Sequence, residues 1–170
     1  MGDRPSGRDE TEEERLDRNL GELLQELRVA LPGVQVLFAF LLAVPFQQNF
    51  AKITHFERDV YFATLLLTAT SAVMLIAPSA YHRLTFHFQH KRRLVFLANR
   101  FAIAGLAFLA LAMTGAIVLI TEVLFDPTMT AITGALAFSM FLVFWLLLPL
   151  RRRFRYLAAG LPTVDLPEDL

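Results

Sequence analysis

The chain has 170 residues, of which 55% are hydrophobic, and its mean hydropathy is +0.49. This apolar content exceeds the roughly 45 to 50% that is typical of soluble domains, so it favours an integral membrane protein. The 16 basic and 16 acidic residues cancel, so the total charge indicates no nucleic-acid partner, and the lack of cysteine excludes disulfides, thiolate metal sites and cysteine nucleophiles.

The N-terminal segment changes character near residue 10. Residues 1–9 combine proline, glycine and charge, and are predicted to be a disordered leader. Residues 10–28 predict an amphipathic cytoplasmic helix, because their leucines follow helical spacing: Leu16, Leu20, Leu23, Leu24 and Leu27. Its many acidic side chains disfavour an acidic lipid surface, so we expect the leucine face to pack on another helix, in its own bundle or in a neighbouring subunit. Pro32 and Gly33 then predict an interruption or a bend.

Four apolar segments are long enough to cross a hydrocarbon core, which needs about 20 residues. They cover residues 29–46, 61–77, 101–120 and 131–150, and none contains a charged residue. Buried helices of a soluble bundle would need polar faces at a 3.6-residue period, which these segments lack. The sequence therefore predicts an all-α fold, an integral membrane four-helix bundle over residues 29–150. A basic and then acidic flexible tail follows at 151–170.

Local signals mark the starts of the second and fourth helices. Thr54 and Glu57 have capping-box spacing, so the second helix is expected to begin near His55. Asp126 followed by Pro127 predicts the N-cap and the first position of the fourth helix. The third and fourth helices should then form a tight antiparallel hairpin.

Basic residues are unevenly distributed, and their distribution predicts the orientation of the chain. The N-terminal segment and the connection between the second and third spans carry five each, and the C-terminal segment carries four, which places 14 of the 16 on one side. The other two connections hold only Lys52 and Arg58. The pattern predicts a multi-pass protein of the cell inner membrane with both termini cytoplasmic.

Cations beside the predicted inner membrane surface are candidate contacts for anionic lipid headgroups. These residues are Arg83, Lys91, Arg92, Arg93, Arg151, Arg152 and Arg153. His82, His87 and His90 lie among them, but no nearby Cys, Asp or Glu completes a usual metal site, so we assign no metal and leave their role open. No nucleic-acid motif accompanies the cations, so membrane lipids are the expected partners.

Small and weakly polar residues recur on every predicted span. Small residues four apart, such as Ala39 and Ala43, are typical of membrane helices that approach closely, and they favour self-association or a membrane-protein partner. Four polar residues within the spans are candidates for helix contacts or for lining a pore: Gln35, Thr64, Thr68 and Ser139.

The sequence contains no pattern typical of an enzyme. It has no phosphate-binding glycine loop, no nucleophile elbow and no metalloprotease histidine pair, so we expect neither catalysis nor a cofactor. An ion-coupled carrier places titratable groups within the membrane, and the predicted spans have none. A structural, regulatory or partner-binding role is the leading interpretation. The alternative is an oligomeric ion channel or transporter, with a passive pore favoured over sodium/proton antiport.

Two stretches carry a resemblance to a known group of proteins. These are ERLDRNLGELLQELRVALPGVQVLFAFLLAVPF, which leads into the first span, and APSAYHRLTF, which leaves the second. They resemble an uncharacterised family of small four-helix actinobacterial membrane proteins, over roughly residues 12–156. Some members are automatically labelled sodium/proton antiporter. The resemblance implies a bacterial inner-membrane protein and assigns no catalytic residues.

Overall fold

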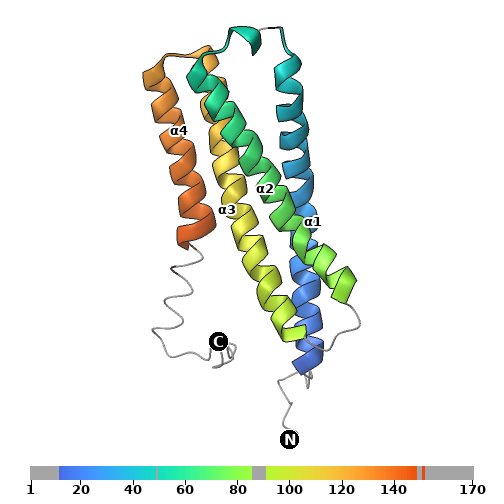
Figure 1. The fold of residues 1–170 in the computed structure, drawn as a ribbon. Coiled ribbons are helices and arrows are strands. Elements are labelled where there is room, and N and C mark those ends of the chain that lie inside the picture. Colours follow the sequence, from blue (N-terminus) through green and yellow to red (C-terminus); the bar gives the residue numbers. More distant parts are fainter. Residues whose placement is uncertain (1–11, 49, 86–90, 149–150, 152–170) are drawn as a thin grey trace, which may run out of the picture. The chain divides into compact units, whose positions relative to one another are not determined.

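The chain is described by a computed structural model that covers residues 12–48, 50–85, 91–148 and 151. These residues form four long helices and no strand (Figure 1): α1 (Glu12–Ala43), α2 (His55–Thr85), α3 (Lys91–Leu124) and α4 (Pro127–Phe141). Short helical turns, η1 (Val44–Phe46) and η2 (Phe50–Lys52), separate α1 from α2. The predicted all-α fold with four helices is confirmed, whereas the predicted leader and most of the tail lie outside the described residues.

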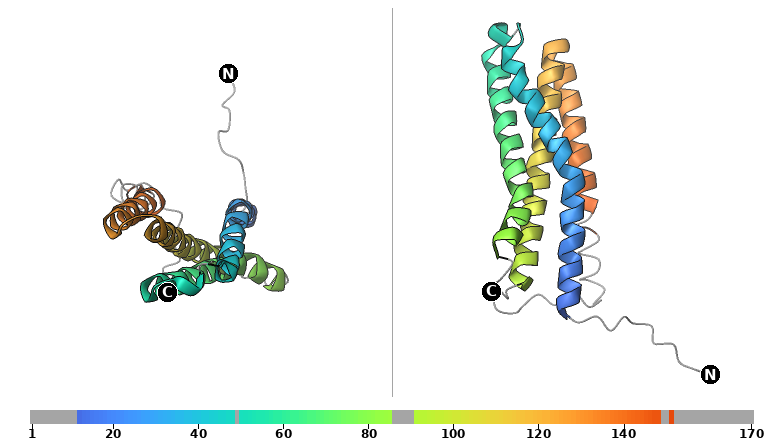
Figure 2. Two further views of the ribbon diagram at one scale, coloured as in Figure 1. Left: turned by 90° about the horizontal axis from the view of Figure 1, so that it is seen from above. Right: turned by 90° about the vertical axis from the view of Figure 1, so that its right-hand side faces the viewer.

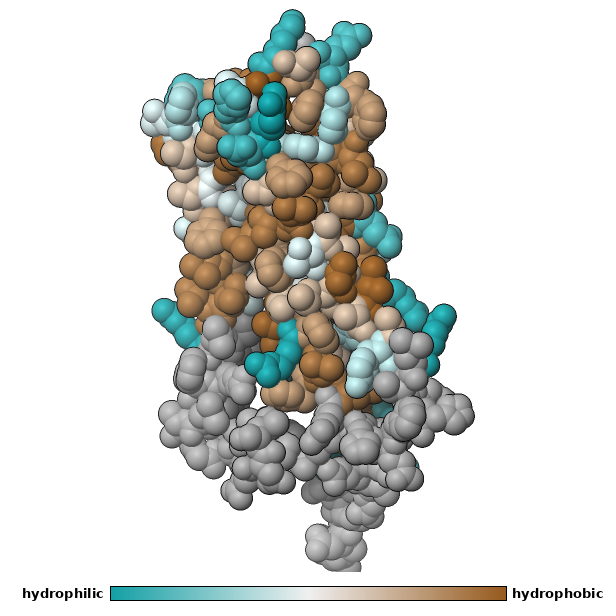
Figure 3. Space-filling view, viewed as in Figure 1, coloured by the Kyte–Doolittle hydropathy of each residue, from teal (hydrophilic) through white to brown (hydrophobic). Residues whose placement is uncertain are grey.

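All four helices are long and apolar enough to cross a membrane. The candidate spans are Glu14–Phe46, His55–Tyr81, Leu94–Leu124 and Pro127–Leu147, and they contain most of the predicted apolar segments. Hydrophobic side chains dominate the visible helix surface (Figure 3), and many large ones are exposed, including Phe46 at 87%. Soluble monomers rarely expose such extensive apolar surface, so the fold is that of a multi-pass membrane protein.

Helix α1 unites the predicted amphipathic helix and the predicted first span in one element of 32 residues. Pro32 lies inside this helix, so the interruption considered from the sequence does not occur. Four buried residues spaced seven apart run along one face on both sides of the proline: Leu20, Leu27, Val34 and Leu41. Because this seam packs on both sides of Pro32, tertiary contacts support a helix that has lost one backbone hydrogen bond.

The chain divides into two compact units, and the first comprises Met1–Lys52 and Leu65–Leu109. It combines α1 with the later part of α2 and the earlier part of α3, which Figure 2 shows from two further directions. The core of this unit is formed by one cluster of buried residues: Leu27, Val34, Leu75, Ala102 and Leu109. All three helices therefore contribute to the same apolar core.

The second unit comprises Ile53–Thr64 and Ala110–Leu170. In it α3 and α4 form the expected antiparallel hairpin, because α3 ends at Leu124 and α4 begins at Pro127. The two helices also touch at Gly134, where an added Cβ would lie 2.8 Å from Val118 Cγ2. Beyond Phe141, α4 continues as a π-helical segment, η3 (Leu142–Leu147). No sequence pattern indicated this change of helix type.

Both predicted helix starts are confirmed. The backbone N–H of Thr54 donates to Glu57 Oε2 at 2.6 Å, and the N–H of Glu57 donates to Thr54 Oγ1 at 3.2 Å, which forms the capping box before α2. Asp126 is the N-cap of α4, and Pro127 is the first helical residue. These signals depend on residues at most three positions apart, so they are readable from the sequence.

The Asp126 cap predicts a pH-dependent stability. The backbone N–H of Met129 donates to the carboxylate and holds the pKa of Asp126 below its ordinary value, and Thr128 lowers the pKa further. A lowered pKa stabilises the folded state above the ordinary pKa of aspartate, and this stabilisation is lost as pH falls through the folded-state pKa. We therefore expect the wild type to exceed Asp126→Asn in stability near neutral pH, with the difference shrinking in acid.

Unfolding by SDS in mixed micelles, followed by circular dichroism over a pH series, measures this difference. Asparagine is a suitable comparison because it also caps helices but does not titrate. A stability difference that stays constant from neutral to acid pH would contradict the assigned role of the Asp126 charge.

Candidate functional site: the buried hydroxyls of α2

One face of α2 buries hydroxyl groups. Thr64, Thr68 and Ser71 are 1%, 0% and 0% exposed, and spacings of four and three residues place them on one side of the helix. Leu75 and Pro78 continue this side and are also buried. We call Thr64, Thr68 and Ser71 the hydroxyl face of α2. Thr64 belongs to the second unit, and the other two residues belong to the first.

In the first unit, Ser71 joins α2 to α3. Its Oγ donates a hydrogen bond to the backbone carbonyl of Gly105 at 2.8 Å, and this bond is buried. Gly105 also faces Leu75, since an added Cβ would lie 2.6 Å from Leu75 Cδ2 and 3.3 Å from its backbone nitrogen. An alanine at this position would have to displace the Leu75 side chain, so glycine suits this close approach of the two helices. The contact combines a small residue with an interhelical hydrogen bond, as expected for helices that pack within a membrane.

In the second unit, Thr64 lies against Gly115 of α3. A Cβ on Gly115 would overlap Thr64 Oγ1, so an alanine here would force the Thr64 side chain to move. The Thr64 hydroxyl donates to the carbonyl of Val60 at 2.7 Å, one turn earlier in α2. The hydroxyl hydrogen of Thr64 therefore bonds to the backbone of its own helix, whereas that of Ser71 bonds to the α3 backbone at Gly105. Both buried hydroxyls are therefore satisfied, and the Ser71 bond also links two helices.

The structure describes all four polar candidates from the sequence, with Gln35 and Thr68 in the first unit and Thr64 and Ser139 in the second. Thr64 and Thr68 lie one turn apart on the buried hydroxyl face of α2. Gln35 and Ser139 are exposed side chains of α1 and α4, so they are not part of that buried face. Sequence reasoning missed Ser71, Gly105 and Gly115, although Ser71 continues the spacing that Thr64 and Thr68 begin.

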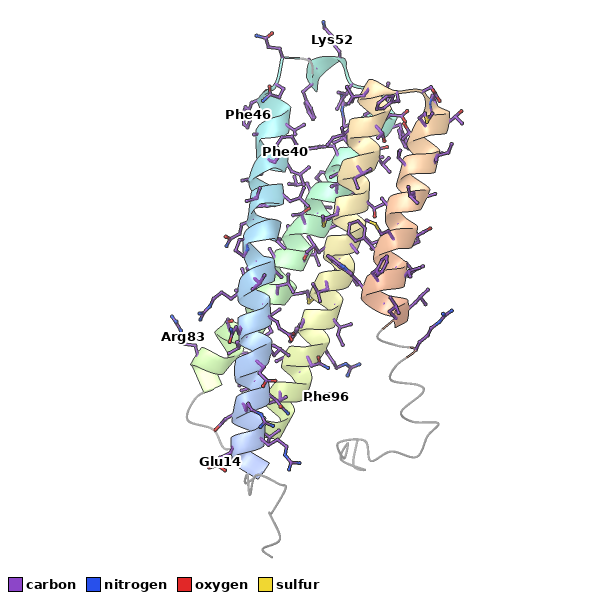
Figure 4. All side chains as sticks on the ribbon, turned by 180° about the vertical axis from the view of Figure 1, so that it is seen from behind. Glu14, Phe40, Phe46, Lys52, Arg83 and Phe96 are labelled. Atoms are coloured by element: carbon purple, nitrogen blue, oxygen red, sulfur yellow. The ribbon has the colours of Figure 1, made fainter. Side chains whose placement is uncertain are left out.

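Only some of the cations that are candidate contacts for lipid headgroups lie within the described residues. Arg83, near the C-terminal end of α2, is exposed (Figure 4). Arg151 is exposed as well, so both guanidinium groups are accessible from outside the chain. The backbone of Lys91, Arg92 and Arg93 forms the first turn of α3, whereas Arg152 and Arg153 lie outside the described residues.

Arg100 adds a contact that sequence reasoning missed. Its guanidinium carbon lies 5.5 Å from the ring centroid of Phe96, one turn earlier in α3, in a cation–π arrangement.

Among the histidines, His87 and His90 are outside the described residues, as is the side chain of His82. Within the described part of the chain, no group of three or more His, Cys, Asp or Glu residues could hold a metal ion.

Comparison with known proteins assigns the family but no activity. No curated protein and no solved structure matches the chain. The sequence model of a Family of unknown function (DUF6328) matches residues 9–149, a range that contains α2, α3, α4 and the whole of α1. This chain therefore belongs to the DUF6328 family, whose function is unknown.

Proposed function

We propose that this chain is a small multi-pass protein of a bacterial inner membrane with a structural, regulatory or partner-binding role, and that it associates with itself. The main support is the hydroxyl face of α2. Ser71 donates to the Gly105 carbonyl and so links α2 to α3, whereas Thr64 donates to the Val60 carbonyl within α2, so both buried hydroxyls have partners inside the chain. On this proposal the chain is not an enzyme and requires no cofactor.

The burial of these hydroxyls argues against an ion path along the hydroxyl face. An ion path needs accessible polar groups that replace the hydration shell of the ion. Hydroxyls that are buried against a facing helix cannot line such a path. Antiport has a further requirement, because protonation must change at a group inside the membrane. Glu122 is the nearest acid to the third apolar segment, and it is half-buried close to the end of α3. A passive pore is thus the second candidate, ahead of sodium/proton antiport.

The proposed orientation places both termini in the cytoplasm, as the distribution of basic residues predicts. In this orientation Arg83, Lys91 and Arg151 lie at the inner membrane surface, where each is expected to attract anionic headgroups by about 1 kcal/mol. The proposed partners are membrane lipids, a second copy of the chain or another membrane protein, and nucleic acid is not among them.

Ion flux into vesicles tests the proposed role against transport. We expect the purified protein in proteoliposomes to give sodium, potassium and proton fluxes equal to those of empty vesicles, with or without a pH gradient. Glu122→Gln and Thr68→Val serve as paired controls for the two transport mechanisms. Sodium uptake that is driven by proton efflux and lost in Glu122→Gln would establish antiport. Passive flux that changes in Thr68→Val would establish a pore, and either result would overturn the proposal.

A further inference from the structure

Gln35 is a strongly polar side chain on an apolar, outward-facing surface of α1. It is exposed, and the adjacent Val36 is 71% exposed. Arg28 precedes Gln35 by seven positions, which is about 10 Å along a helix axis, and Gln47 follows it by twelve, which is about 18 Å. Gln35 is therefore well inside the apolar stretch that Arg28 and Gln47 delimit. No described residue hydrogen-bonds to its side chain. Gln35 therefore presents an amide to the hydrocarbon layer.

An unpaired amide in hydrocarbon is unfavourable, because lipid tails offer it no hydrogen-bond partner. Exposed hydroxyls elsewhere in the chain avoid this cost within their own helices. Thr133 Oγ1, for example, donates to the Met129 carbonyl four residues earlier at 2.8 Å, and Ser139 has the same option. The longer amide of Gln35 makes no such bond within the described chain, so it needs a partner from outside.

The surface around Gln35 permits another helix to approach closely. Ala39 and Ala43 follow at intervals of four residues on the same side of α1, and both are exposed. We call Gln35, Ala39 and Ala43 the Gln35 face. Small residues let two helix backbones come near enough for a side-chain amide to reach across. The Gln35 face thus offers both the space and the polar group that a helix contact in a membrane requires.

We propose that the Gln35 face binds the same face of a second copy of this chain, and this inference rests on the self-association in the proposed function. An amide carries donors and an acceptor, so two glutamines can pair reciprocally. All copies insert with one orientation, and a two-fold axis along the membrane normal therefore brings Gln35 to Gln35 at the same depth. A different protein would need its own polar group at that depth, whereas a second copy supplies one automatically.

Energy transfer between labelled copies in lipid vesicles tests this contact. Donor and acceptor dyes are attached to a single cysteine at Gln25, an exposed position of α1, and the dimer dissociation constant is measured by lipid dilution. We expect Gln35→Leu to weaken dimerisation about fivefold to tenfold, as for the loss of one interhelical hydrogen bond or a pair of them. Gln35→Asn should retain part of the affinity, and Ser139→Ala on α4 should dimerise as the wild type does.

Cysteine cross-linking in native membranes supplies an independent readout. Gln35→Cys should form a disulfide-linked dimer faster than Phe40→Cys, because position 40 lies about 140° around the helix from position 35 (Figure 4 labels Phe40). Equal dimerisation of Gln35→Leu and wild type would overturn this interface and leave self-association intact. A wild type that is monomeric at every density would overturn both. Cross-linking of Gln35→Cys only to a protein of different mass would replace the second copy with another partner.

Discussion

Gly105→Ala is expected to lower the free energy of unfolding in mixed micelles by about 1 to 3 kcal/mol, the usual range for overpacking a tight site. The added Cβ would lie 2.6 Å from Leu75 Cδ2 and 2.7 Å from Leu75 Cγ. Leu75 is 0% exposed and belongs to the core of the first unit, so any movement of its side chain disturbs the packing of that core. The helix propensity of alanine, which exceeds that of glycine by up to about 1 kcal/mol, offsets only part of this cost.

Gly33→Ala is the matched control, because Gly33 is also within a membrane-spanning helix but an added Cβ there meets nothing within 4 Å. Its stability should equal or slightly exceed that of the wild type. Adding Leu75→Ala to Gly105→Ala removes the atoms that clash, so the double variant should lose less stability than the two single variants together. Unfolding by SDS titration with circular dichroism measures all four proteins. Equal stability of Gly105→Ala and Gly33→Ala would show that α2 and α3 do not approach closely at this position.

Signals within a few residues of one another were sufficient to predict several features of the fold. The capping box of Thr54 and Glu57 and the N-cap at Asp126 were both found as expected. Each depends on hydrogen bonds between a side chain and a backbone group of the same short segment. The apolar segments were equally readable, because crossing a membrane sets the minimum length of a helix.

Features that depend on packing between distant segments could not be predicted in the same way. Pro32 and Gly33 indicated an interruption or a bend by their local chemistry. The interruption does not occur, because the buried seam of Leu27, Val34 and Leu41 runs past Pro32 in one continuous helix. The importance of Gly105 likewise depends on its alignment with Leu75, 30 residues earlier, which no local pattern specifies.

The candidate site was predicted only in part for the same reason. Residue type identified Gln35, Thr64 and Thr68 as polar groups within apolar segments. Residue type alone does not distinguish a buried side from an exposed side of a helix that is apolar nearly all around. The structure separates them, since Thr64 and Thr68 are buried on α2 and Gln35 is exposed on α1. This difference is the basis for assigning internal packing to the threonines and an external contact to the glutamine.

Cysteine labelling that reports the orientation of the chain should show the largest difference between positions. A cysteine on one side of the membrane reacts with an impermeant reagent, and one on the other side does not. Cations near the ends of spans are retained on the cytoplasmic side. Of the 16 basic residues, 14 lie before the first predicted apolar segment, between the second and the third, or after the fourth. The natural chain contains no cysteine, so single introduced cysteines report without background. Gln48, Phe125 and Gln25 are suitable positions, since all three are exposed.

The most direct test of a protein with four spans and both ends in the cytoplasm is therefore the labelling of these cysteines in intact cells by a membrane-impermeant maleimide. Gln48→Cys, between α1 and α2, and Phe125→Cys, between α3 and α4, should be labelled without permeabilisation. Gln25→Cys, in the N-terminal half of α1, should be labelled only after the membrane is permeabilised. Labelling of Gln25→Cys in intact cells, with Gln48→Cys protected, would reverse the orientation, and equal labelling of all three before permeabilisation would contradict a membrane-spanning chain.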